Sequence, residues 1–250
     1  MADVKQDWEF YPCQVDDHPA SIFLNLGYAE HLPLTDSPTL LVIGLQMLEP
    51  GDHGIGVEPD VRTLFAAEDV IVAEAEARGL RFVGRVRHNG DWQLSFYGRP
   101  EHEPMLAEIA LLGLGEQARG YRTASQDDPD WGYFRTFLMP NRERFQWIMN
   151  RRVVDQLRTH DDRLEEARPV DHYLEFPLDA TLEPFIAQVE ELGFTVVDAP
   201  AAQDGRLLVH LCRSDALDGL RIHGVVMELI HLATAAGGEY EGWGCTPVTD

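Results

Sequence analysis

The pattern of apolar and polar positions predicts that the chain opens with a β-hairpin and continues into a buried strand. Apolar residues recur from Trp8 to Pro12 and from Pro19 to Leu26, with a polar turn at residues 15–18 between them. Two such runs around a short polar break are typical of paired strands. Residues 39–48 then form a continuous apolar run, which is typical of a strand in the middle of a sheet.

The segment that follows alternates between helical and strand patterns. A proline in the expected first turn and a terminal glycine mark the first helix, and Asn89-Gly90 is a strong hairpin signal between two strands. The expected elements are a helix over residues 59–79, strands over 80–88 and 92–97, a second helix over 100–113, and closing strands over 121–124 and 133–138. Residues 39–126 therefore predict the order β-α-β-β-α-β after the hairpin.

The same order of elements is predicted a second time from residue 171. Thr181 is a suitable N-cap, and Pro184 lies in a first helical turn, where proline is tolerated. The expected elements are strands over 173–176, 194–197, 207–211 and 239–243, with helices over 181–193 and 215–235. The two halves share this order without obvious sequence identity, so the repeat is one of architecture.

Each half has the number and order of elements of a ferredoxin-like sandwich, in which two helices cover one face of an antiparallel sheet. We therefore predict an α+β protein of two tandem ferredoxin-like domains, the first with an extra N-terminal β-hairpin. The first domain is expected to span residues 1–140 and the second 171–250. Residues 141–170 are expected to form a connecting helix and a solvated linker, with packing on the first domain through Phe145, Ile148, Met149 and Val153.

The chain is strongly acidic, with 43 aspartate and glutamate residues against 20 lysine and arginine residues and a net charge of −23. Residues 171–250 alone carry 14 acidic residues against three arginines, net −11, whereas residues 141–170 carry seven arginines against six acids, net +1. Such a surface repels phosphates and anionic lipid, which argues against direct binding of nucleic acid or a membrane. A basic protein segment is the natural partner class, and the alternative is that the charge serves only solubility.

The remaining composition indicates a protein of the cytoplasm. No apolar run reaches the roughly 18 to 20 residues of a membrane span, and the first residues lack the pattern of a signal peptide. Cys13, Cys212 and Cys245 are odd in number and widely spaced, which suits reduced thiols better than a disulfide framework. Lys5 is the only lysine, so Schiff-base chemistry and a phosphate-loop lysine have no plausible residue.

Candidates for catalysis or metal binding are few. His223, Glu228 and His231 lie at helical spacings, but no third metal ligand of the usual kind accompanies the two histidines. A solvated or half-buried helix face explains them better. His210 and Cys212 share a strand face, for which a core position is a better explanation than a metal or redox site. We therefore predict no enzyme, no catalytic residue, no metal and no cofactor.

The last domain resembles the ribonuclease E regulator B (RraB-like) family over about residues 171–248. The likeness rests on the β-α-β-β-α-β order, the acidic balance and the ending Glu239-Tyr240-Glu241-Gly242-Trp243-Gly244. Residues 8–138 resemble a domain of unknown function often fused in front of RraB-like domains, through Trp8-Glu9-Phe10-Tyr11, Pro19-Ala20-Ser21-Ile22-Phe23 and Trp131-Gly132-Tyr133.

The resemblance implies a cytoplasmic inhibitor of ribonuclease E that acts through the basic, disordered scaffold region of the nuclease and neither cuts nor binds RNA. The chain departs from the better-known members in its extra N-terminal domain and in having only Gly244 to Asp250, rather than a long acidic tail, after Trp243. One alternative is a neutraliser of a basic toxin, of the immunity-protein or antitoxin kind. Another is a metal-dependent enzyme that uses the histidines near residue 228.

Within the last domain, Glu239, Tyr240, Glu241 and Trp243 are the residues that we expect to contact the partner, by charge and by an aromatic anchor. Tyr240 and Trp243 differ in strand parity, so only one of them is expected to face the helices. A Trp243 that caps the core is the competing interpretation. Replacing Trp243 with alanine separates the two, because weaker binding without unfolding supports a contact and melting supports a core position.

Overall fold

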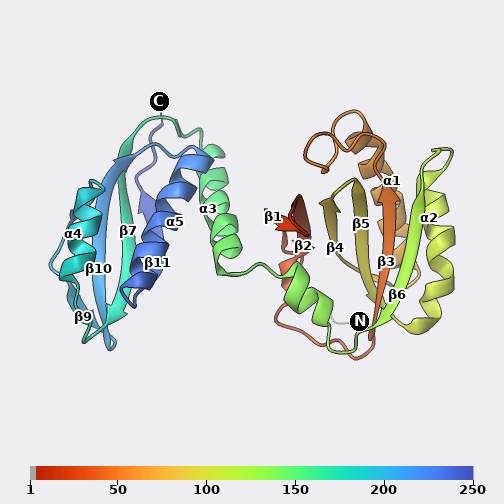
Figure 1. The fold of residues 1–250 in the computed structure, drawn as a ribbon, viewed down its shortest axis with the longest axis horizontal. Helices are drawn as coiled ribbons and strands as arrows, with labels where there is room; N and C mark the ends of the chain where they lie inside the picture. The colour runs from red at the N-terminus through yellow and green to blue at the C-terminus, as the bar shows by residue number, and fades with distance from the viewer. Residues whose placement is uncertain (1–3, 250) are drawn as a thin grey trace. The chain divides into compact units, whose positions relative to one another are not determined.

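The computed structural model describes residues 4–249 and shows an α+β protein with two antiparallel sheets (Figure 1). The chain divides into two compact units, residues 1–145 and 146–250, and each unit contains one sheet. The predicted class, α+β with one antiparallel sheet in each half, is confirmed. Within residues 4–249, no helix combines the length and the apolar composition needed to cross a membrane.

The sheet of the first unit has six strands in the order β1-β2-β4-β5-β3-β6. The strands are β1 (Trp8–Val15), β2 (His18–Asn25), β3 (Thr39–Gln46), β4 (Arg81–His88), β5 (Asp91–Gly98) and β6 (Tyr121–Asp127). β1 and β2 form the predicted hairpin, in which Asp16 and Asp17 both have the positive φ angles of a tight two-residue connection. Asn89 and Gly90 join β4 to β5 in the same way, which confirms the second predicted hairpin.

Two helices cover one face of this sheet. Helix α1 (Asp60–Ala77) and helix α2 (Leu106–Leu114) pack on side chains that alternate along the central strands. Short 3-10 turns occupy Leu26–Tyr28 and Pro100–Met105. The helices contribute Leu64, Ala67, Ile71, Ala75, Leu106, Ile109, Ala110 and Leu114 to this core, and β3 and β5 contribute Leu41, Ile43, Leu45, Trp92, Leu94 and Phe96.

The segment 133–138, predicted as a closing strand, is instead part of a short helix that ends in a π-helical turn at Phe134–Leu138. The prediction is wrong because Asp128 acts as a helix cap. Its carboxylate accepts hydrogen bonds from the backbone amides of Gly132 (2.7 Å) and Tyr133 (3.0 Å). Phe134 and Leu138, which lie four residues apart on this helix, are both fully buried.

This short helix packs on the side of the sheet that α1 and α2 do not occupy. The ring of Trp131 stacks on Tyr97 of β5, with the ring centroids 3.8 Å apart. The hydroxyl of Tyr11 on β1 donates a hydrogen bond to the carbonyl of Leu138. Tyr97 neighbours the helix-facing Phe96, so by the alternation of a strand it points to the opposite face. The first sheet is therefore packed on both sides over part of its area.

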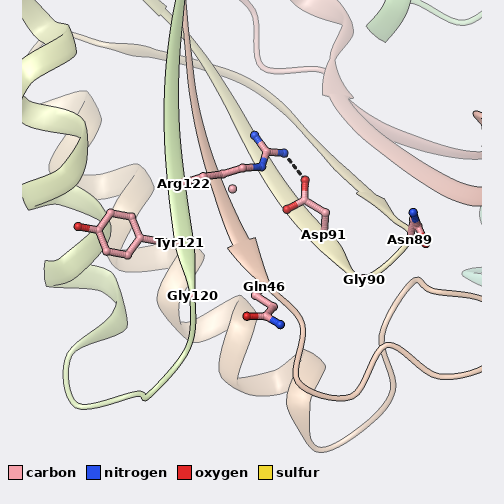
Figure 2. Close-up of a pocket in the computed structure, with 8 residues that line it drawn as sticks. Gln46, Asn89, Gly90, Asp91, Gly120, Tyr121 and Arg122 are labelled. Carbon is pink, nitrogen blue, oxygen red and sulfur yellow. Dashed lines mark hydrogen bonds and ion pairs between the residues drawn. The ribbon is translucent and has the colours of Figure 1, made fainter.

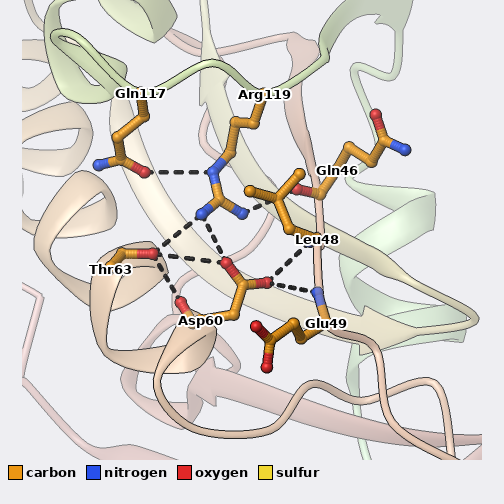
Figure 3. A network of polar contacts seen from close by, with 7 residues as sticks. All are labelled: Gln46, Leu48, Glu49, Asp60, Thr63, Gln117 and Arg119. Atoms are coloured by element: carbon orange, nitrogen blue, oxygen red, sulfur yellow. Dashed lines mark hydrogen bonds and ion pairs between the residues drawn. The ribbon is translucent and has the colours of Figure 1, made fainter.

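A buried ion pair joins the β3–α1 connection to the α2–β6 connection at one end of the first sheet (Figure 3). Arg119 donates hydrogen bonds to the Asp60 carboxylate (2.6 Å) and to the Gln46 carbonyl (2.8 Å). The other carboxylate oxygen of Asp60 accepts the backbone amides of Leu48 (2.8 Å) and Glu49 (3.1 Å). Burial opposes ionisation of Asp60, but the hydrogen bonds from Arg119 and the two amides hold the pKa of its carboxyl below the usual value.

The sheet of the second unit has the order β11-β7-β10-β8, and β9 pairs with β10. The strands are β7 (Arg168–Pro177), β8 (Thr195–Val196), β9 (Ala201–Gln203), β10 (Arg206–Asp215) and β11 (Glu239–Cys245). Helices α4 (Glu183–Glu191) and α5 (Gly219–Ala235) share one core with the inward side chains of β7, β10 and β11. Between β8 and β9 the chain leaves the edge of the sheet at residues 197–200.

Helix α3 (Arg142–Arg158) crosses the division between the units, and most of its length lies in the second. Val153, Val154 and Leu157 contact the apolar core of the second unit. Val153, which was expected to pack on the first domain, packs against the core of the second unit, because the apolar stripe continues through Val154 and Leu157 into that core. The expected solvated linker is also partly buried, since Arg168 donates to both carboxylate oxygens of a buried Asp162 (2.7 and 2.6 Å).

Candidate functional site

Strand β11 carries the four residues that we expect to contact a partner, and a β-bulge decides which way two of them face. In the pairing with β7, Tyr240 lies opposite Leu174 and Trp243 lies opposite His172, with Glu241 as the extra residue between them. Leu174 and His172 are both buried. Tyr240 and Trp243 therefore both lie on the helix-covered face. The expectation that only one of them faces the helices is wrong, because the bulge shifts the alternation by one residue.

Tyr240 is buried against β7. Its hydroxyl lies 2.9 Å from Nδ1 of His172, whose fully buried ring packs edge-on against Phe194. Burial lowers the pKa of His172 to about 4, although the carboxylates of Asp215 and Asp171 act in the opposite direction. Burial also raises the pKa of Tyr240. Both groups are consequently neutral at pH 7, and their contact holds β11 to β7.

Trp243 joins β11 to two helices. Its indole Nε1 donates a hydrogen bond to Oδ1 of Asn150 on α3 (3.0 Å), and the ring packs, partly buried, against the core of the second unit. Asn150 is itself buried, and its amide nitrogen lies 3.2 Å from Nδ1 of His223 on α5. These contacts favour a core position for Trp243 over an exposed anchor.

Replacing Trp243 with alanine is expected to destabilise the second unit by about 2 to 3 kcal/mol, somewhat less than the cost of emptying a fully buried aromatic site. The Trp243→Phe variant keeps most of the packing but loses the hydrogen bond to Asn150, which is expected to cost about 1 kcal/mol. Urea unfolding followed by circular dichroism measures both changes. Unchanged stability of the alanine variant would contradict the core position and would support the interpretation of Trp243 as a partner contact.

The other two expected contact residues, Glu239 and Glu241, are exposed. The Glu239 carboxylate lies 3.4 Å from Nη2 of Arg206, and Nε of the same arginine lies 3.6 Å from the Glu175 carboxylate. Within residues 4–249, no side-chain hydrogen bond or ion pair engages the carboxylate of Glu241. The bulge thus leaves one glutamate free on the face of the sheet opposite α4 and α5.

Two stacked rings occupy the middle of this opposite face. The rings of Tyr173 on β7 and His210 on β10 have their centroids 4.9 Å apart and are inclined by 20°. Tyr173 remains 48% exposed. His210 lies between two carboxylates, with Nε2 2.8 Å from Asp171 and Nδ1 3.8 Å from Asp198. We call the surface formed by these four residues together with Glu175, Glu239 and Glu241 the outer face of the second unit.

A pocket of about 380 Å³ opens on the outer face. The chain at residues 197–200 forms one wall, and the amide of Val197 donates to the carbonyl of His210 (2.9 Å) and holds this wall near β10. The pocket is lined by the rings of Tyr173 and His210, by the acidic residues Glu175, Asp198 and Glu241, and by Ala199, Ala201 and Leu208. Aromatic, acidic and small apolar groups in one pocket suit a cationic group on an aliphatic stem.

Sequence reasoning missed Tyr173, His210 and Asp198 as site residues. One signal for Tyr173 was present, namely the alternation along β7. Residues 170, 172, 174 and 176 are buried on one side of the strand, and Tyr173 lies on the other side. A strand with one apolar and one polar side indicates an open face. The stacking of Tyr173 on a residue 37 positions later, and the excursion that brings Asp198 beside His210, depend on pairing across the sheet and leave no local pattern.

The first unit has a smaller pocket of about 250 Å³ at one end of its sheet (Figure 2). Arg122 on β6 extends across β3 at Gly44 and forms an ion pair with Asp91 on β5. A side chain at Gly44 would collide with the Arg122 guanidinium, because a Cβ placed there lies 2.8 Å from it. In this pocket the charges of Arg122 and Asp91 therefore pair with each other, and Gly44 leaves room for the arginine side chain between them.

His210 and Cys212, for which a core position was expected, instead lie on the outer face, where both contact Asp171. Within residues 4–249, no group of three or more His, Cys, Asp or Glu side chains is placed to hold a metal ion. His223 is directed toward Asn150. Burial raises the pKa of the Cys212 and Cys245 thiols, with a further contribution from Asp171 at Cys212, which disfavours the reactive thiolate.

The solved structures that the chain matches share little sequence with it. A glycine cleavage system transcriptional repressor, by its description, is 10% identical, with 83% of this chain and 98% of that chain covered at a TM-score of 0.27. An unknown protein from Galdieria sulphuraria is 12% identical, with 82% and 96% covered at a TM-score of 0.22. At such TM-scores the likeness supports no statement about function.

Two family profiles match consecutive parts of the chain. The family of unknown function DUF695 matches residues 6–139, and the family described as regulator of ribonuclease activity B, RraB, matches residues 147–245. No curated protein matches the chain. The RraB match includes most of α3, in agreement with the packing of that helix on the second core. The chain therefore belongs to the DUF695 family, whose profile covers more than half of its length, and its second unit is an RraB domain.

Proposed function

We propose that this protein is a non-enzymatic cytoplasmic regulator that inhibits a ribonuclease E-type nuclease by binding its basic scaffold region. Membership of the second unit in the RraB family supports the regulation of ribonuclease activity. The observation that carries the binding step is the outer face of the second unit, an exposed aromatic stack among carboxylates in a region of net charge −11. We also propose that both units are ferredoxin-like, on the strand orders β6-β3-β5-β4 and β11-β7-β10-β8.

The four residues of β11 take two different roles in this proposal. Glu239 and Glu241 contact the basic segment, because both are exposed on the strand. Tyr240 and Trp243 hold β11 in place through His172 and Asn150, so they support the site without touching the partner. Along β11, the exposed residues Glu239 and Glu241 therefore alternate with Tyr240 and Trp243, which hold the strand in place.

The electrostatics of the outer face favour a protein segment over RNA as the bound molecule. Carboxylates at the pocket repel phosphate and attract guanidinium or ammonium groups. A disordered basic segment also arrives rapidly under such attraction, and its encounter rate falls as salt screens the charges. The proposal needs no reacting group, since inhibition follows from occupying the scaffold of the nuclease.

Reversal of one charge tests the proposal. Glu241→Arg is expected to weaken binding of the ribonuclease E scaffold segment about tenfold at low salt, a change of about 1.4 kcal/mol. Glu190→Arg, on an exposed position of α4, changes the net charge by the same amount away from the outer face. Isothermal titration at two salt concentrations compares both variants with the unmodified protein.

The outcome of that comparison separates three cases. Loss of affinity at Glu241→Arg alone, together with weaker binding at high salt, supports docking on the outer face. Equal loss at Glu190→Arg would show that only the overall charge matters and would contradict the assigned face. Absence of binding at low salt would refute the scaffold region as partner, and a tight, salt-resistant complex with one folded basic toxin would favour the neutraliser instead.

A further inference from the structure

The most specific feature of the outer face is the uncovered side of the Tyr173 ring. In the sheet, Tyr173 on β7 lies between His210 on β10 and Gly242 on β11. His210 stacks on the ring, whereas Gly242 has no side chain, and a Cβ placed there would meet nothing within 4 Å. The cross-strand neighbour on the β11 side therefore leaves open space beside the tyrosine.

Carboxylates line the pocket that includes this open space. Glu241, the bulged residue next to Gly242, lines the pocket, and so do Glu175 and Asp198. The Glu175 carboxylate already forms an ion pair with Arg206. Glu241 remains for a ligand, because the Asp198 carboxylate already lies 3.8 Å from Nδ1 of His210. A planar cation on the Tyr173 ring would have the Glu241 carboxylate of β11 within reach.

Within this chain, two arginine side chains each contact an aromatic ring and a carboxylate. The guanidinium of Arg213 lies 4.2 Å from the centroid of Phe194 and is hydrogen bonded by two of its nitrogens to Asp215 (2.8 and 3.0 Å). Arg85 lies 4.8 Å from the centroid of Trp92 and donates to Glu68 (2.7 Å). The outer face offers the same pair of groups at Tyr173 and Glu241.

We propose that the pocket of the outer face recognises one arginine side chain of the bound segment, with the guanidinium stacked on Tyr173 and hydrogen bonded to Glu241. Leu208 and Ala201 line the same pocket and accommodate the aliphatic stem. The inference rests on the proposed function, because it names the group that the basic segment contributes. It assigns the Gly242 position a role, which is to keep the tyrosine ring uncovered.

Arginine is favoured over lysine at such a place for two physical reasons. The guanidinium is planar, so it stacks on a ring and presents paired donors to a carboxylate, whereas an ammonium group is a compact and strongly hydrated point charge. Arginine is also the more frequent partner of aromatic rings in proteins. A surface that attracted positive charge alone would not distinguish the two residues at equal net charge.

Two peptides of equal length and charge test the inference. One alternates arginine with glycine, and the other has every arginine replaced by lysine. Titration by calorimetry is expected to give about tenfold tighter binding of the arginine peptide to the unmodified protein, and this preference is expected to disappear in Tyr173→Leu. Tyr121→Leu on β6 of the first unit, where the tyrosine is also exposed, is the matched control and should retain the preference.

The outcomes distinguish this inference from the proposed function. Equal binding of both peptides, or a preference that survives in Tyr173→Leu, would overturn the arginine pocket while leaving a charge-driven regulator intact. If neither peptide nor the scaffold segment binds at low salt, the proposed function itself fails. Glu241→Gln provides a second variant at an exposed position, and it is expected to reduce the affinity for the arginine peptide several-fold if the guanidinium reaches this carboxylate.

Discussion

Replacing Asp60 with asparagine is expected to destabilise the first unit by about 3 to 5 kcal/mol, the largest effect that we expect of any single substitution discussed here. The variant leaves the buried guanidinium of Arg119 without a counter-charge, because the side chains of Arg119 and Asp60 are 2% and 5% exposed. It also weakens the hydrogen bonds that the carboxylate accepts from the Leu48 and Glu49 amides. Loss of this pair disconnects the start of α1 from the end of β3.

Hydrogen exchange of the α1 and β3 amides, with thermal unfolding of the full chain, measures this effect in the unit concerned. Arg62→Gln is the control, since the pair of Arg62 with Glu58 (3.5 Å) is exposed, and loss of such a pair costs about 0 to 1 kcal/mol. Similar stability of the two variants would show that the buried pair is replaceable. Because the pKa of Asp60 is lowered in the folded protein, its contribution is present above about pH 4 and is lost at more acidic pH.

The second unit is expected to lose about 3 kcal/mol of stability as the pH falls from about 6.5 to about 4. Burial lowers the pKa of His172 to about 4, whereas a histidine in an unfolded chain has a pKa of about 6.5. Between these values the unfolded chain binds a proton that the folded unit does not, so acidification favours unfolding. Above about pH 6.5 both forms are neutral and the full stability is present.

The imidazole resonances of His172 measure this directly in an NMR titration, and urea unfolding across the same range measures the stability. Replacing His172 with phenylalanine is expected to flatten the pH dependence, although the Tyr240 hydroxyl then loses its partner at 2.9 Å. Replacing the exposed His160 with glutamine is the control and should leave the slope in place. An unchanged slope in the His172 variant would show that other groups cause the acid sensitivity.

Much of the fold follows from local patterns in the sequence. Both tight hairpins of the first unit were recognisable, because residues 15–18 and Asn89-Gly90 are short polar breaks between apolar runs. The order β-α-β-β-α-β follows from helical stripes between strand-like runs, apart from the short strand β9 (Ala201–Gln203), which was not predicted. The segment 133–138 misled this reasoning, because aromatic and β-branched residues favour a strand while a cap at Asp128 starts a helix.

The candidate site was less accessible to such reasoning. The motif at 239–244 drew attention to β11, but the direction of each side chain depends on a bulge that only the pairing with β7 creates. Tyr173 and His210 come together because β7 and β10 are neighbours in the sheet. The acidic balance led to the proposed class of partner, whereas the pocket proposed to select arginine is formed by residues far apart in the chain.

The measurement that tests the central claim most directly is an NMR titration of the isotope-labelled full chain with the basic scaffold segment of ribonuclease E. The account predicts that amide shifts concentrate on the outer face of the second unit, at Tyr173, His210, Glu241 and Gly242. The amides of α4 and α5, which cover the opposite side of the same sheet, are expected to move little. Shifts confined to those helices or to the first unit, or no shifts at low salt, would contradict the account.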